Sequence, residues 1–196
     1  MTAPRTAFVA APVLMGAYGV IRMLDGLDGS RGPGFAWSLG HLCFLASLVL
    51  FVQGFAAMRA MAGGGRVAGV GLWTGTAGAV ALAGQFAIDL VVGFMSADRG
   101  AMDEMFSRIQ DIPGMLPVFY EFGPLLFFVG QLILVAQLAA RRVLKPWAPV
   151  LVLVSACVPL IGKDFIPLGA ALLLVAFAPL RPDRETVTVD PKVPVA

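Results

Sequence analysis

The chain has 196 residues, of which 59% are hydrophobic and 13% are charged, with a formal net charge of +2. Soluble domains contain roughly 45–50% apolar and about 25% charged residues, so a soluble fold of this size has too little interior for the excess apolar surface. The small net charge, without a basic stripe interleaved with aromatic residues, excludes a nucleic-acid-binding domain. The sequence therefore predicts an all-α, polytopic transmembrane helix bundle. The preference for Arg over Lys, with abundant Ala and Gly, is typical of a bacterial protein.

Six apolar stretches follow one another along the chain. They cover residues 6–24, 35–58, 67–95, 116–140, 147–162 and 165–180. A helix needs about 20 residues to cross the hydrocarbon core, and the first four stretches have that length. The last two are shorter, but Lys163 and Asp164 between them predict a turn, and the pair is too long for one span. We therefore expect six spans, with a re-entrant hairpin in place of the last two as the alternative.

The first stretch is expected to be a membrane span, with a cleaved signal peptide as the alternative. Arg5 precedes its apolar part, as in a signal peptide. However, Arg22 and Asp25 follow the apolar part directly, and no A-x-A cleavage site intervenes.

The basic residues predict the orientation of the bundle. With the N-terminus inside, nine of the 14 fall on the cytoplasmic side, namely Arg5, Arg59, Arg66, Arg141, Arg142, Lys145, Arg181, Arg184 and Lys192. The other five fall outside, namely Arg22, Arg31, Arg99, Arg108 and Lys163. This asymmetry predicts a multi-pass protein of the cell membrane with both termini in the cytoplasm. Residues 1–180 are expected to form one transmembrane domain, and residues 181–196, with three prolines among polar residues, a disordered cytoplasmic tail.

The segment between the third and fourth stretches, residues 96–116, carries apolar side chains at helical spacing. They are Met102, Met105, Phe106 and Ile109. Asp98 is the expected N-cap, and Pro113 with Gly114 ends the pattern. The spacing predicts a short amphipathic helix on the outer membrane surface. A connector resting at the interface is the favoured interpretation, and a lid or a helix that docks a partner through these four residues is the alternative.

The third stretch carries small residues at a four-residue spacing, Gly71, Gly75 and Ala79. Such spacing places a flat stripe on one face of a helix, where another backbone can approach closely. We expect the stripe to pack against a neighbouring span of the same chain. A homodimer or another membrane protein held through the same stripe is the secondary interpretation.

Asp89 is the most informative polar residue because it lies inside the third apolar stretch. Six further residues, at 1.5 Å rise each, place it about 9 Å from the end of that stretch. Gln85 lies one helical turn away on the same face. A carboxylate at that depth needs a partner, a proton or water, so Asp89 is a candidate for a functional site.

Other polar side chains fall at the same level, toward the predicted outer ends of the spans. They are His41, Glu121, Arg22, Lys163 and Asp164. The inner half offers only the non-ionisable Gln53, Gln131 and Gln137. With Asp89 and Gln85, the outer groups predict a ligand or ion pocket open to the outside. The competing interpretation is structural, with interfacial anchors and a cation that holds Asp89 in register.

The sequence predicts no cofactor and no metal site. A single histidine excludes a bis-histidine haem within one chain, and the H-E-x-x-H and G-x-x-x-x-G-K-[ST] motifs are absent. Cys43 and Cys157 form neither a C-x-x-C motif nor a closely spaced pair, so both are expected to be buried free thiols.

Three functions remain open. The favoured one is a non-catalytic membrane subunit or assembly factor with an outward-facing polar pocket. The second is a small carrier or an ion or proton pathway that uses Asp89, Glu121 and His41; such a pathway needs polar groups in both halves of the bundle. The third is a membrane-embedded enzyme with Asp89 and Glu121 as acid and base, although these two carboxylates lack a recognisable nucleophile or metal set.

Overall fold

The computed structural model describes residues 3–27, 29 and 31–180, and every regular element in this part of the chain is a helix. The predicted tail, residues 181–196, lies outside the described residues. The elements in order are α1 (Ala3–Asp25), α2 (Phe35–Met61), α3 (Arg66–Met95), α4 (Arg99–Gln110), the π-helical η1 (Leu116–Phe122), α5 (Gly123–Ala140), α6 (Ala148–Ile161), the 3₁₀ turn η2 (Lys163–Phe165), α7 (Ile166–Ala176) and the 3₁₀ turn η3 (Ala178–Leu180).

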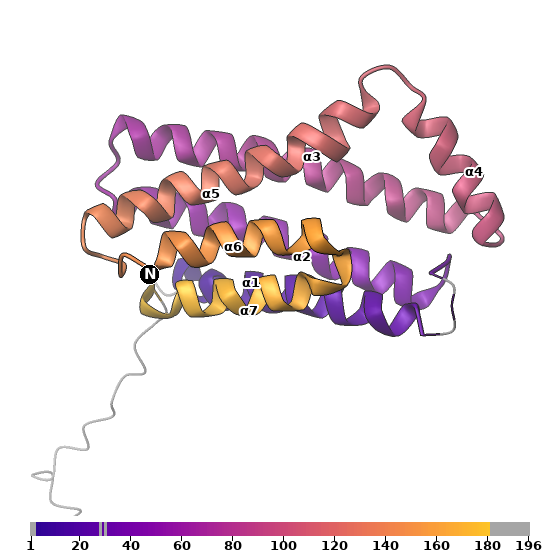
Figure 1. Ribbon diagram of the computed structural model, residues 1–196. Helices are drawn as coiled ribbons and strands as arrows, with labels where there is room; N and C mark the ends of the chain where they lie inside the picture. The colour runs from indigo at the N-terminus through magenta and orange to yellow at the C-terminus, as the bar shows by residue number, and fades with distance from the viewer. Residues whose placement is uncertain (1–2, 28, 30, 181–196) are drawn as a thin grey trace, which may run out of the picture.

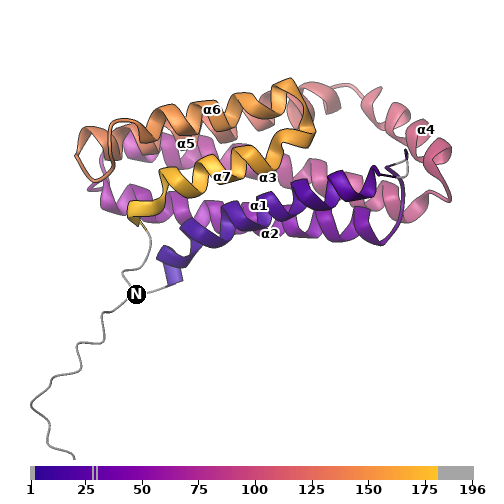
Figure 2. The ribbon, with the colours of Figure 1, turned by 60° about the horizontal axis from the view of Figure 1, so that its bottom comes forward.

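Of the seven α-helices in the described residues, α4 lies at one end, and the other six run lengthwise in an antiparallel bundle (Figure 1). This end also carries the α1–α2 connection and the α6–α7 turn, and we call it the α4 end. The opposite end carries the α2–α3 and α5–α6 connections. Figure 2 shows α6 and α7 side by side on one face of the bundle, with their turn short of the α1–α2 connection.

Within the described part of the chain, four helices are long and apolar enough to cross a membrane. They are Thr6–Asp25, Phe35–Met61, Arg66–Met95 and Leu116–Ala140. The shorter α6 has 14 residues, which correspond to about 21 Å of helix. Both α6 and α7 carry many apolar side chains on the surface of the bundle, as expected for helices that face lipid.

The α3–α5 seam forms the tightest contact in the bundle, and glycines permit it. A Cβ atom added to Gly78 would lie 2.0 Å from the backbone nitrogen of Phe127, and one added to Gly130 would lie 2.1 Å from that of Gly75. The predicted stripe of Gly71, Gly75 and Ala79 is buried here against α5 and α2 of the same chain. The stripe thus packs within the chain, and a partner held through it stays a prediction.

The connector between α3 and α5 contains the helix α4. The Asp98 carboxylate caps it by accepting a hydrogen bond of 2.9 Å from the Ala101 backbone N–H, which confirms the predicted N-cap. Met102 is buried inside the protein, and the Phe106 ring lies 6.3 Å from the Trp37 ring. The apolar side of α4 is therefore turned, at least at these two residues, toward the bundle. Placement of α4 on an outer membrane surface stays a prediction.

The entry into α5 is irregular, and this irregularity positions one side chain of the site. Residues of η1 form wider π-type turns, with the Gly123 N–H bonded to the Val118 carbonyl. Pro124 follows directly and has no N–H for a regular helical bond to Tyr120, so the α-helical ladder is interrupted at this point. As a result the Tyr120 side chain reaches α3, as described below.

Candidate polar site

The α4 end contains a polar cleft of about 510 Å³. Side chains from α1, α2, α3, α4, η1 and the two connections at this end line it. They are Tyr18, Arg22, Arg31, Trp37, His41, Gln85, Asp89, Arg99, Asp103, Phe106, Ser107, Gln110, Tyr120 and Lys163. Segments far apart in the sequence therefore place their polar residues around one space, at the level that the sequence predicted for the pocket.

Asp89 and His41 form the buried polar pair of the cleft. The Nε2 atom of His41 lies 3.5 Å from Oδ2 of Asp89, and their side chains are only 4% and 12% exposed. The Nδ1 atom of His41 lies 2.7 Å from the carbonyl oxygen of Trp37. Because a carbonyl can only accept, Nδ1 must be the donor, which turns Nε2 toward the carboxylate. The two side chains thus face each other inside the protein, His41 from α2 and Asp89 from α3.

Two aromatic side chains complete the surroundings of Asp89. The Tyr120 hydroxyl donates to Oδ1 of Asp89 over 3.4 Å, a long hydrogen bond. The Trp37 indole N–H donates to the Asp89 backbone carbonyl over 3.0 Å, and its ring lies 4.2 Å from the His41 ring. Residues of α2, α3 and η1 thus fix the carboxylate and the imidazole in place.

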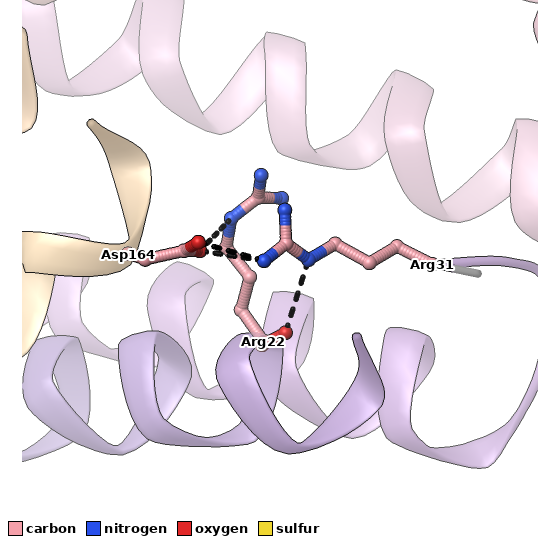
Figure 3. Close-up of polar contacts among 3 residues, drawn as sticks. All are labelled: Arg22, Arg31 and Asp164. Carbon is pink, nitrogen blue, oxygen red and sulfur yellow. Dashed lines mark hydrogen bonds and ion pairs between the residues drawn. The ribbon is translucent and has the colours of Figure 1, made fainter. Parts of the chain in front are cut away.

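A second cluster joins α1, the α1–α2 connection and the α6–α7 turn. Arg31 bonds both carboxylate oxygens of Asp164 over 2.8 Å, and its Nε donates to the Arg22 carbonyl over 3.3 Å. The Nε of Arg22 lies 3.6 Å from the same carboxylate, within ion-pair range but beyond a hydrogen bond, so it remains buried without a hydrogen-bond partner. Figure 3 shows the two guanidinium groups side by side next to this carboxylate.

The cleft carries an excess of positive charge. Four basic side chains border it, Arg22, Arg31, Arg99 and Lys163, against the carboxylates of Asp89, Asp103 and the neighbouring Asp164. Arg99 is paired with Asp103 at 2.9 Å, whereas Lys163 makes no ion pair with any described residue. Two arginines share Asp164, and Asp25 lies beside the same two arginines in a small adjoining hollow. Among the side chains that line the cleft itself, however, basic groups outnumber carboxylates, and this balance favours an anion.

Aromatic rings pack together on the side of the polar pair that faces the opposite end. Tyr18 packs edge-on against Phe44 and Phe86 at 5.1 and 5.2 Å, and these two rings stack on each other at 4.0 Å. Phe44 lies one turn beyond His41 on α2, and Phe86 one turn before Asp89 on α3, so both lie on the far side of the polar pair. Rings of Phe51, Phe55 and Phe127 continue this packing.

The structure brings most of the predicted pocket residues together. Asp89, His41, Gln85, Arg22 and Lys163 line the cleft, and Asp164 pairs with two of its arginines. Glu121 lies elsewhere: it is exposed and lines an apolar groove between α5 and α6. Its neighbour Tyr120 takes the place beside Asp89.

Nine of the 14 lining residues were not predicted for the pocket from the sequence, namely Tyr18, Arg31, Trp37, Arg99, Asp103, Phe106, Ser107, Gln110 and Tyr120. Tyr18, Trp37 and Tyr120 could have been suspected from the sequence. Each is an aromatic residue with a polar atom near the end of an apolar stretch, where the ring can be buried while the polar atom reaches water. Arg31 lies in the α1–α2 connection, whose course the apolar pattern does not describe. Arg99 and the other four missed residues lie on α4, whose packing against the bundle the pattern does not describe either.

No cluster of three or more metal-ligating side chains occurs within the described part of the chain. Both cysteines are free, as predicted, but Cys157 is exposed instead of buried. Only one face of α6 packs against the bundle, and Cys157 lies outside that face. No known family model matches the chain, and no curated protein or solved structure is significantly similar to it.

Proposed function

We propose that the chain is a non-catalytic, six-span protein of the cell membrane that binds an anionic group in the cleft at its α4 end. In this proposal both termini are cytoplasmic, so the cleft opens outward. The role fits a membrane subunit or assembly factor that holds its ligand without transforming it.

The observation that carries the proposal is the arrangement around Asp164. Two guanidinium groups share this one carboxylate, one of them with a buried Nε that lacks a hydrogen-bond partner, and Lys163 stands beside them without an ion pair among the described residues. In this partly buried cluster the cationic groups have fewer acceptors than they can bind. An anion would supply further acceptors and negative charge. The cleft of about 510 Å³ offers room for a phosphate-sized group.

A carrier or an ion pathway has less support. The stacked rings of Phe44 and Phe86 lie beyond the His41–Asp89 pair, and no ionisable side chain is buried farther toward the opposite end in the described bundle. The enzyme hypothesis needs two cooperating carboxylates, but Glu121 is exposed outside the cleft that Asp89 lines. A binding role requires neither a pathway nor a second acid.

The test measures the unfolding midpoint of the purified protein in detergent with sodium phosphate and with sodium chloride at equal ionic strength. Phosphate should raise the midpoint more than chloride. Lys163→Gln removes an exposed cation with no described ion pair, so it should weaken phosphate binding about fivefold without a folding defect. Arg22→Gln combined with Arg31→Gln should weaken it further.

The matched control is Arg66→Gln combined with Arg141→Gln, because these arginines are exposed at the opposite end. The control should respond to phosphate as the wild type does. Equal midpoints in phosphate and chloride, or equal losses in the control and the cleft variants, would overturn the proposal.

A further inference from the structure

We propose that the anionic group is the headgroup phosphate of a phospholipid, with one acyl chain of that lipid in the groove between α5 and α6. This inference rests on the proposed function, since the cleft must first bind an anion. It adds the chemical class of the ligand, an anionic amphiphile taken from the bilayer.

The groove has the size and surface of an acyl-chain site. Its volume is about 470 Å³, and apolar side chains of both helices line it, among them Leu125, Phe128 and Leu132 of α5 and Leu153 of α6. On α5 alone it extends about 12 Å from Pro124 to Leu132, along the length of the bundle. A hydrocarbon chain placed there would run parallel to the helices, as lipid chains do.

The groove and the cleft share one lining residue, Tyr120, whose hydroxyl is directed to Asp89 on the cleft side. At the end of α6, Leu160 lines the groove and Lys163, three residues later, lines the cleft. A molecule that follows the groove toward the α4 end therefore passes from apolar side chains to basic ones between η1 and the α6–α7 turn.

The charged residues indicate that the headgroup lies in the cleft and the acyl chain in the groove. Arg22, Arg31 and Lys163 favour a phosphate in the cleft. Glu121 is exposed at the groove side of Tyr120, where its carboxylate repels an anionic headgroup. The headgroup is thus expected beyond Tyr120, and the acyl chain next to Glu121.

A lipid suits this pair of sites better than a soluble anion or an acidic peptide. A soluble anion would use the cleft and leave about 470 Å³ of apolar groove without a role. An acidic peptide would bring unpaired backbone polar groups into an apolar groove on the lipid-facing side of α5 and α6, at considerable cost in free energy.

The experiment compares phosphatidylglycerol with phosphatidylcholine of the same acyl chains, and with inorganic phosphate, by the unfolding midpoint of the full chain in detergent. Phosphatidylglycerol should stabilise the protein at lower concentration than either. Cys157→Trp fills the groove from an exposed position, so it should weaken phosphatidylglycerol binding at least fivefold and leave the phosphate response unchanged. Val154→Trp is the control, because Val154 is exposed on the same helix but does not line the groove.

A second readout does not depend on the tryptophan variant. In a Cys43→Ala background, phosphatidylglycerol should slow alkylation of the natural Cys157 by a lipophilic maleimide at least threefold more than phosphatidylcholine does. Phosphate binding without preference for phosphatidylglycerol, and without protection of Cys157, would overturn the lipid inference and leave the cleft an anion site. Loss of every response, including that to inorganic phosphate, would overturn both proposals.

Discussion

The two ends of this bundle differ in where their polar side chains lie and in what they contact. At the α4 end, buried or half-buried polar side chains contact one another: His41 with Asp89, and Arg22 and Arg31 with Asp164. At the opposite end, arginines such as Arg59 and Arg66 are exposed, and the interior is apolar except for a few side chains.

Gln131 makes the contrast sharper. It is fully buried in α5, and neither its amide nitrogen nor its amide oxygen has a hydrogen-bond partner. Burial of a polar group therefore does not by itself identify a site in this bundle. A site is marked by polar groups that converge on one space and are mutually oriented, as they are only at the α4 end among the described residues.

The largest expected effect comes from the α3–α5 seam, on which both ends depend. Gly78→Ala places a Cβ atom against the Phe127 backbone, which cannot move unless the two helices separate. The free energy of unfolding should fall by about 3 kcal/mol. Gly69→Ala is the control on the same helix, since its nearest neighbour is the Arg59 side chain at 4.0 Å, and it should be neutral or slightly stabilising. Equal stabilities of the two variants in a denaturation titration would show that the seam is not tightly packed.

The buried pair should be coupled, unlike the exposed pairs of the same end. Asp89→Asn should cost about 1–2 kcal/mol, because it removes the charge that faces His41. A double-mutant cycle with His41→Gln should give a coupling above about 0.5 kcal/mol. The same cycle for Arg99→Gln and Asp103→Asn should give less, because both side chains are about half exposed. Additive effects of His41→Gln and Asp89→Asn would mean that the pair has no structural role.

Away from the α4 end, removal of a buried polar group should increase the stability of the protein. Gln131→Met replaces an amide without partners by an apolar side chain of similar size, so the free energy of unfolding should rise by about 1 kcal/mol. Gln85→Met is the matched change at the α4 end, where the residue lines the polar cleft, and it should give no gain. Destabilisation by Gln131→Met would indicate that this amide has a partner that the described structure does not contain.

The smallest global effect is expected for α4. Phe106→Asp places a charge near the Trp37 ring, so α4 should loosen while the bundle stays folded. Limited proteolysis should then cut residues 96–115 faster, with a change in global stability below about 0.5 kcal/mol. Ser107→Asp, an exposed change on the same helix, should leave the rate of cutting unchanged. Equal protection of Phe106→Asp and the wild type would mean that α4 does not dock through this ring.

Hydropathy and spacing predicted much of this architecture, because span length, the Gly71–Ala79 stripe and the Asp98 cap are local properties of the chain. The depth of Asp89 also indicated the level of the site. Its true neighbours could not be derived in the same way, since the π turns before Pro124 rotate the chain so that Tyr120, and not Glu121, faces α3. The same holds for Arg31, whose contact with Asp164 joins residues 133 positions apart.

In the proposed topology the two ends of the bundle face opposite sides of a membrane, with the cleft outside. Single cysteines at Gly64 and Ser107, in a background with Cys43→Ala and Cys157→Ala, test it with a membrane-impermeant thiol reagent on intact cells. Both positions are exposed, Gly64 in the α2–α3 connection and Ser107 on α4. We expect labelling at Ser107 and none at Gly64 until the cells are permeabilised. Labelling at Gly64 in intact cells, with Ser107 protected, would contradict this topology.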